Sequence, residues 1–375
     1  MPRDGVWRYP KSIIEVRQLS KYDACRTNCQ TIETIRRNSC TGRRKEPASH
    51  RICTGRTAAE FGYWRHDVKQ QAVLVAGVNV IEIKSARIAA GRSICLSATT
   101  DAAAQESDEG MHVLLCERYA RVAVPAGMVG LWCPLSSGIW VEALGARFFV
   151  RRGNVYTSDF DHAHDISSSM HGACVGVVAK HSTWSQLMAM FAQDASVCPV
   201  VFPANHPMPA GSRLALLQLV RRALHGSQTA APSRAEHFGQ LMVQMQQHFS
   251  PMLQRCPGTS EVRRRQIFLR LQRARHMIQT SPSRNIDIST LGALTNYSAN
   301  QLIRLYHRIF GETPYSSLLR TRVEFARHLI RETNMGISEV SRVSGFENRT
   351  SFARAFKMHC GSTASSFRNS LRQAG

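Results

Sequence analysis

Hydrophobic and polar positions alternate in short runs over the middle of the chain. From about Ala72, runs rich in Val, Ile, Leu and aromatic residues are separated by Gly, Pro, Ser and Asp, which is typical of β-strands joined by turns. Many short strands at this spacing predict a sandwich or a small barrel. The predicted strands are 73–83, 111–116, 121–124, 129–133, 139–144, 147–151, 155–158 and 174–179, and Gly145-Ala146 predicts a tight hairpin.

The period changes to that of helices after residue 210. The pattern predicts a helix over 212–225, bounded by Gly226, and a second over 233–249. The second carries one apolar stripe, formed by Phe238, Leu241, Met242, Met245 and Phe249. This stripe either packs on its own domain or forms a homodimer contact. A linker, residues 256–260, follows.

The last 115 residues contain an internal duplication. Ile288-Ser289-Thr290-Leu291 corresponds to Ile337-Ser338-Glu339-Val340 at an offset of 49, and Asn296-Tyr297 to Gly345-Phe346. After one inserted residue, Phe310-Gly311 corresponds to Cys360-Gly361 at an offset of 50. The repeat indicates two copies of one supersecondary unit.

Each copy predicts a helix, a turn and a second helix. Ser289 or Thr290 and, in the second copy, Ser338 are suitable N-cap residues, whereas Asn296 and Gly345 stand where a left-handed residue would end the short helix. The second helices are predicted over 298–309 and 348–359. Their outer faces carry polar and basic side chains that suit base edges or phosphates.

Two further helices complete this part of the chain. Pro314 favours a long helix over 315–332, which spans about 27 Å and could set two recognition helices into successive major grooves, about 34 Å apart. An opening helix over 263–279 is expected to expose Arg263, Arg264, Arg270 and Arg273. These arginines form either a solvated face or phosphate contacts.

Net charge points to a polyanionic partner. The 375 residues include 48 Lys+Arg and 26 Asp+Glu, for a formal net charge of +22. Residues 261–375 carry +12 of it, residues 61–260 only +3, and residues 1–60, which we expect to be a basic disordered segment, +7. We therefore expect a nucleic-acid surface on the last 115 residues.

Signals for secretion and membrane insertion are lacking in the sequence, so we expect a cytoplasmic protein with no membrane contact. Eleven scattered cysteines indicate reduced thiols. The first four cysteines suggest a zinc site, but they lack the usual paired spacing; they are Cys25, Cys29, Cys40 and Cys53. His162-Ala163-His164 resembles a cupin metal pair, yet lies in a predicted polar loop, 158–169, without the accompanying Glu. We expect no metal and no cofactor.

A long, ordered set of residues extends over nearly the last third of the chain. Its members are Leu291, Ser298, Leu302, Arg304, Gly311-Glu312-Thr313-Pro314, Arg322, Ala326, Leu329-Ile330, Ile337, Val340, Gly345-Phe346, Phe352, Arg354-Ala355-Phe356-Lys357, Gly361-Ser362-Thr363 and Phe367-Arg368. In these residues, the stretch from about 263 to 372 resembles the DNA-binding domain of the AraC/XylS family of bacterial transcription regulators. Ala364 and Gly292 depart from the family pattern.

This resemblance implies a DNA-reading surface on the second helix of each unit. The positions that would face the bases are Ala299, Asn300, Ile303 and Arg304 in the first unit and Arg349, Thr350, Ala353 and Arg354 in the second. Arg304 and Arg354 have a structural alternative, pairing with Glu312 or Glu347. The family also implies a transcription activator that contacts double-stranded DNA and RNA polymerase, with a β-rich regulatory domain and a small-molecule effector.

The predicted fold class is α+β and multidomain. A β-rich, cupin- or jelly-roll-like regulatory and dimerisation domain with C-terminal helices, residues 65–255, precedes an all-α DNA-binding domain, residues 261–375, with helix-turn-helix units at about 289–310 and 338–360. In the β-rich domain, Trp132, Trp140, Phe148, Phe149 and Tyr156 either line an effector pocket or form core.

Two other functions stay open beside the non-enzymatic regulator. An adaptive-response-type alkyl-transfer protein would join a zinc-thiol domain, built on Cys25, Cys29, Cys40 and Cys53, to the same DNA-binding module. A nucleoid-type architectural protein would bind DNA without operator preference.

Overall fold

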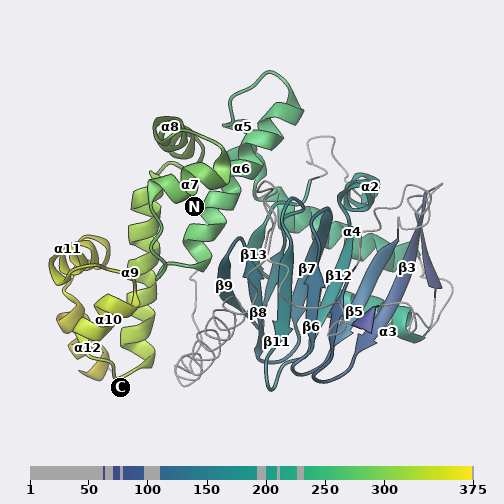
Figure 1. Cartoon of the computed structure of the whole chain (residues 1–375), viewed down its shortest axis with the longest axis horizontal. Helices are drawn as coiled ribbons and strands as arrows, with labels where there is room; N and C mark the ends of the chain where they lie inside the picture. The colour runs from purple at the N-terminus through teal and green to yellow at the C-terminus, as the bar shows by residue number, and fades with distance from the viewer. Residues whose placement is uncertain are drawn as a thin grey trace, which may run out of the picture. The chain divides into compact units, whose positions relative to one another are not determined.

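The computed structural model describes residues 62–63, 71–76, 79–96, 110–191, 200–208, 212–225 and 232–373. The predicted N-terminal segment 1–60, with Cys25, Cys29, Cys40 and Cys53, lies outside these residues. Among the described residues, two β-sheets account for most of the first part, and the part after residue 208 is helical (Figure 1). The predicted fold class, a β-rich part followed by an all-α part, is confirmed.

The strands form two sheets. One sheet has the order β1-β4-β6-β11-β8-β9 and the other β13-β10-β7-β12-β5-β3-β2. The first consists of β1 (Gly62–Tyr63), β4 (Ser93–Cys95), β6 (Arg121–Val124), β11 (His164–Ser168), β8 (Gly138–Ala143) and β9 (Ala146–Arg151). The second consists of β13 (Ala204–Pro207), β10 (Asn154–Thr157), β7 (Met128–Pro134), β12 (Cys174–Lys180), β5 (Met111–Cys116), β3 (Asn79–Ile88) and β2 (Gln71–Ala76).

The second sheet is buried on both faces because successive side chains of a strand point to opposite sides. On β7, Val129 and Leu131 join a core with the helices that follow the sheet, whereas Met128 and Trp132 join a core with the first sheet. The same alternation holds on β5 and β12. Both faces are therefore apolar, which explains why these strands read as nearly continuous hydrophobic runs.

Helices α2 (His181–Phe191), α3 (Ser212–His225) and α4 (Pro232–Gln247) cover the outer face of the second sheet (Figure 1). On α4, Leu241, Met242 and Met245 are buried in the core that they share with Val129 and Val177. This part of the predicted stripe packs within its own chain, so it offers no free apolar face for a dimer contact.

Several observed strands and turns differ from the predicted ones. The run 73–83 is two strands, β2 and β3, which pair antiparallel. The hairpin between β8 and β9 turns at Leu144-Gly145, both with positive φ, one residue before the predicted position. The predicted polar loop 158–169 contains strand β11, which pairs with β6 and β8. The loop prediction was wrong because polar residues such as Asp165 and Ser167, which favour loops, lie within this strand.

The C-terminal part is helical. The short α5 (Ser250–Gln254) precedes α6 (Glu261–Thr280), and the segment between them corresponds to the predicted linker. The remaining helices are α7 (Ile288–Thr295), α8 (Ala299–Phe310), α9 (Pro314–Glu332), α10 (Ile337–Val343), α11 (Arg349–Cys360) and α12 (Ala364–Gln373). Within the described ranges, no helix combines the length and the apolar character that crossing a membrane requires.

Candidate nucleic-acid interface

Helices α7 and α8 form the first helix pair, termed the first unit. Asp287 caps α7 by accepting a hydrogen bond from the Thr290 backbone N–H at 2.7 Å, so the N-cap predicted at Ser289 or Thr290 was wrong. Asn296 ends α7 in the left-handed conformation, with φ 54°, as predicted. Ser298 then opens α8 with a capping box to Gln301.

Buried side chains fix α8 against the rest of its unit. Leu302, Tyr306 and Ile309 recur at helical spacing and are fully buried. Burial raises the pKa of Tyr306 to about 12, and its hydroxyl donates a hydrogen bond to Ser317 on α9 at 3.2 Å. The opposite face of α8 is exposed, including Ala299, Asn300, Ile303 and Arg304.

Helices α10 and α11 form the second unit. The N-cap of α10 is Gly336, which has no side chain, and not the predicted Ser338. Gly345 follows α10 with φ 90°, a left-handed conformation that ends this helix as predicted. Asn348 caps α11 by accepting from the Ser351 backbone N–H at 2.8 Å. The helices predicted over 298–309 and 348–359 are thus α8 and α11, displaced by one residue.

The second unit repeats the separation of buried and exposed faces. Phe352, Ala355 and Phe356 are buried, whereas the residues predicted to face DNA are exposed on the other side of α11. Those exposed residues are Arg349, Thr350, Ala353 and Arg354. All eight predicted site residues are therefore accessible to a ligand.

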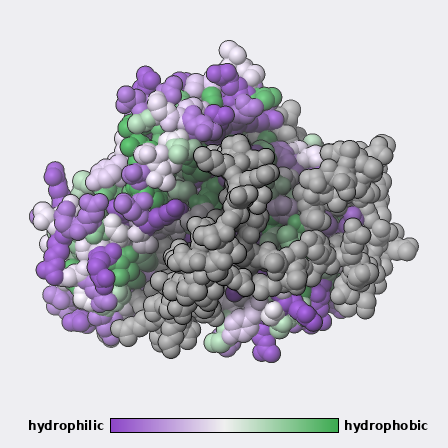
Figure 2. All heavy atoms as spheres, viewed as in Figure 1, coloured by the Kyte–Doolittle hydropathy of each residue, from purple (hydrophilic) through white to green (hydrophobic). Residues whose placement is uncertain are grey.

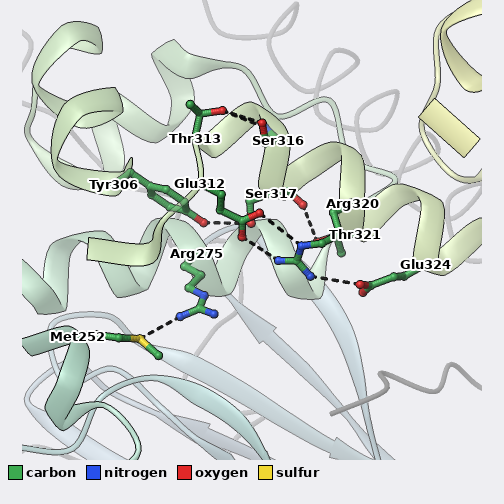
Figure 3. Close-up of polar contacts among 10 residues, drawn as sticks. All are labelled: Met252, Arg275, Tyr306, Glu312, Thr313, Ser316, Ser317, Arg320, Thr321 and Glu324. Carbon is green, nitrogen blue, oxygen red and sulfur yellow. Dashed lines mark hydrogen bonds and ion pairs between the residues drawn. The ribbon is translucent and has the colours of Figure 1, made fainter. Parts of the chain in front are cut away.

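The structural alternative for Arg304 and Arg354 finds no support in the contacts. Glu312 accepts hydrogen bonds from Arg320 at 2.8 and 3.3 Å, and Arg320 also reaches Glu324 at 3.2 Å (Figure 3). These two carboxylates raise the pKa of Arg320, which remains a cation. Across the described residues, neither Arg304 nor Arg354 has a hydrogen bond or an ion pair. Their guanidinium groups are available for phosphates or bases.

Helix α9 connects the two units and lies between α8 and α11 (Figure 1). Thr313 caps it and Pro314 occupies its first position, so the helix begins one residue before the predicted range 315–332. Its 19 residues span about 28 Å. In the space-filling view, hydrophilic residues dominate the visible surface of this helical part (Figure 2). The spacer and the polar surface both suit a long polyanion.

Arg273 on α6 differs from its neighbours and from the prediction. Its side chain is only 7% exposed and donates from Nη2 to Asp159 at 2.8 Å, with a second ion pair to Asp161. Burial would raise the pKa of Asp159, but hydrogen bonds from His162 and Arg273 outweigh burial and hold it below its usual range. Arg273 therefore contacts the β-rich part of the chain, and the prediction that it is exposed was wrong.

Within the His162-Ala163-His164 sequence, His164 begins strand β11 and belongs to the core, whereas Ala163 is exposed and His162 is half-buried. His164 is 3% exposed, and its Nε2 accepts a hydrogen bond from Trp132 Nε1 at 3.2 Å. Burial lowers the pKa of His164 to about 4, so the ring is neutral. Of the aromatic residues considered for a pocket, Trp132, Phe148 and Tyr156 are buried in the core between the sheets, which supports their core interpretation. No group of three metal-ligating side chains occurs in the described ranges.

Comparison with known proteins identifies the class of the C-terminal part. Residues 291–370 match the helix-turn-helix domain family model, a stretch that begins in α7 and ends in α12. The C-terminal part of the chain is therefore a helix-turn-helix domain. More specifically, it is a helix-turn-helix domain of the AraC/XylS type, as the sequence resemblance predicted.

Curated relatives are named as regulators. The chain is 29% identical over 80 residues to the probable transcriptional regulator LumQ of Photobacterium leiognathi, covering 21% of this chain and 32% of LumQ. It is 26% identical over 146 residues to the HTH-type transcriptional regulator GbdR of Pseudomonas aeruginosa strain UCBPP-PA14, covering 39% of this chain and 38% of GbdR. The aligned stretches thus span about a third of each relative's length.

Among solved structures, the C-terminal domain of AraT, a response regulator from Geobacillus stearothermophilus, is similar to this chain at 25% identity. The match covers 27% of this chain and 84% of that domain, with a TM-score of 0.26.

Sequence reasoning missed two features around this interface. One is Asp159, whose partner Arg273 lies 114 residues away, so that no local pattern indicates the pair. The other is Asp287, which precedes the predicted cap by two residues. For Asp287 a signal existed, because aspartate is as good an N-cap as serine.

Proposed function

We propose that the protein is a sequence-specific transcription regulator that reads two successive major grooves of duplex DNA with α8 and α11. The observation that carries this proposal is the paired arrangement of two capped helices, each with four exposed site residues, on either side of α9. Exposed arginines are the side chains that most often read guanine. The formal charge of +12 on residues 261–375 supports attraction to phosphates.

We further propose that the protein activates transcription in contact with RNA polymerase. This part of the proposal derives from the resemblance to the AraC/XylS regulators and from the regulator names of LumQ and GbdR. From the same resemblance we also propose that the protein binds a small-molecule effector and forms a homodimer. If a homodimer forms, its contact must lie away from Leu241, Met242 and Met245, because the protein's own core buries them.

Genome-wide binding combined with transcript profiling of a deletion strain tests this function. We expect occupancy at a limited set of promoters that share a sequence motif, and lower transcript levels of the adjoining genes after deletion. Occupancy that follows local DNA abundance without a motif would instead identify a nucleoid-type architectural protein. Higher transcript levels after deletion would identify a repressor.

A further inference from the structure

Arg322 lies in the middle of α9 and reaches beyond its own helix. Its Nε donates to the Pro282 carbonyl oxygen at 2.9 Å, and its Nη2 donates to the Arg284 carbonyl oxygen at 3.1 Å. Pro282 and Arg284 belong to the segment that joins α6 to α7, directly before the first unit. One guanidinium group thus fixes the entry to the first unit on the spacer helix, using two donors in one plane.

The same guanidinium group contacts the turn of the second unit. Its central carbon lies 5.9 Å from the ring centroid of Phe346, which directly follows Gly345. The Phe346 ring in turn packs edge-on against Phe352 of α11, with a centroid separation of 5.3 Å. Only Phe346 therefore separates Arg322 from Phe352 on α11, the helix that carries Arg349 and Arg354.

The turn of the second unit and the entry segment of the first lie against each other. A Cβ atom at Gly345 would lie 2.8 Å from the Pro282 carbonyl oxygen and 3.0 Å from both Arg322 Nε and the Ser283 Cα. Such a close approach requires glycine, and Gly345 also has a φ of 90°. The turn of the second unit thus lies in tight backbone contact with the segment that enters the first unit, and Arg322 holds that segment with two hydrogen bonds.

We propose that Arg322 is a positioning residue that fixes the orientation of α11 relative to the first unit and so sets the spacing of the two DNA half-sites. The inference rests on the proposed reading of DNA by both units. One additional base pair rotates the second half-site by about 35° and moves it by about 3.4 Å. Two units held in a fixed relative orientation cannot bind both half-sites after this displacement. Without the Arg322 hydrogen bonds, the second unit can rotate relative to the first and bind its half-site.

The test measures how strictly the full-length protein requires one spacing. An operator is first selected from random duplexes with the wild-type protein, and versions with one base pair inserted or deleted between the half-sites are then prepared. We expect the wild type to bind the altered spacings roughly tenfold or more weakly, a loss comparable to that of a mismatched base pair. Arg322→Met should bind all spacings with affinities within about threefold of each other, because the two hydrogen bonds are lost.

Two further variants separate positioning from charge and from folding. Arg118→Met removes the same charge from an exposed position in the β-rich part of the chain and should keep the wild-type spacing requirement. Arg322→Lys keeps the charge and can reach one carbonyl oxygen at a time, so it should give an intermediate requirement even if Arg322→Met does not fold.

The outcomes distinguish this inference from the proposed function. If Arg322→Met and Arg322→Lys lose affinity equally at every spacing, the inference is overturned while the proposed function stands. A wild-type protein that binds its selected operator but is indifferent to spacing also overturns the inference. If the selection enriches no sequence at all, the proposed function itself fails.

Discussion

Arg349 is the first residue of α11, and its side chain is exposed beside the N-terminus of that helix. Because an arginine in this position can donate two hydrogen bonds to one guanine, we expect Arg349→Ala to lower the affinity for the selected operator by roughly 1 to 3 kcal/mol. The loss should be largest on the operator and small on unrelated DNA. Titrations at a fixed salt concentration, followed by fluorescence anisotropy, measure both affinities.

Arg118→Ala is the matched control, because Arg118 is exposed in the β-rich part of the chain and its loss changes the net charge equally. Equal losses for the two variants would mean that Arg349 contributes only charge.

Arginines in one sequence context can serve different purposes. Arg263 and Arg273 both fall on the predicted basic face of α6, yet Arg263 is exposed and Arg273 is buried against Asp159. Helical periodicity places a side chain on a face, but it does not indicate which parts of the chain later cover that face. The exposure of the eight residues proposed to face DNA could be predicted, because it depends only on the local separation of polar and apolar positions in α8 and α11.

At the scale of elements, the caps and turns determine where each helix begins and ends. Asn296 and Gly345 were predictable as helix ends, since only a few residues adopt the left-handed conformation easily. Strand β11 was not predictable, because Asp165 and Ser167 alternate with His164 and Ile166, and Ile166 is the one strongly strand-forming residue in the stretch. The backbone pairing with β6 and β8, which is a long-range property, forms this strand.

Gly345 offers a test of the contact between the two units. Gly345→Ala places a Cβ 2.8 Å from the Pro282 carbonyl oxygen in addition to forcing alanine into the left-handed region. We expect a loss of about 3 kcal/mol or more in the free energy of unfolding, from strain of roughly 1 to 2 kcal/mol plus the displacement of the entry segment. Urea titrations of the full-length protein measure this change.

Gly361→Ala separates the two contributions. Gly361 has a φ of 73°, but a Cβ added there would meet no atom within 4 Å, so only the backbone strain should remain. Equal destabilisation by both substitutions would show that the entry segment does not press against the second unit.

For the molecule as a whole, buried histidines connect stability to pH. Burial lowers the pKa of His164 to about 4, of His206 to about 3 and of His276 to about 4. The unfolded chain, with histidine pKa values near 6.5, binds more protons than the folded chain below this pH. Folding stability is therefore expected to fall as the pH decreases from about 6.5 to 4, by about 1.4 kcal/mol per pH unit for each histidine.

His276→Phe isolates one of these contributions. The His276 ring lies parallel to Tyr156 and edge-on to Phe148, at 5.7 and 5.3 Å between centroids, and phenylalanine can keep both contacts. We expect the substitution to remove about 1.4 kcal/mol per pH unit from the slope of stability between pH 6 and pH 5. Urea titrations across this pH range measure the slope. An unchanged slope, equal to that of the exposed control His307→Phe, would contradict this account.

The charge distribution distinguishes the parts of the molecule. Residues 61–260 carry +3 and provide the two sheets with the helices α2, α3 and α4 that cover the second sheet, whereas residues 261–375 carry +12 and present both units. Phosphate attraction can hold the helical part on any duplex, and the exposed residues of α8 and α11 would then discriminate sequence. We propose that α8 and α11 discriminate sequence together, each in its own groove.

Hydroxyl-radical footprinting of the full-length protein on its selected operator tests that claim most directly. We predict two protected segments on one face of the duplex, separated by about 10 base pairs, with the Arg349→Ala variant losing protection at only one of them. Protection of a single segment, or uniform protection along the duplex, would contradict the reading of two successive grooves.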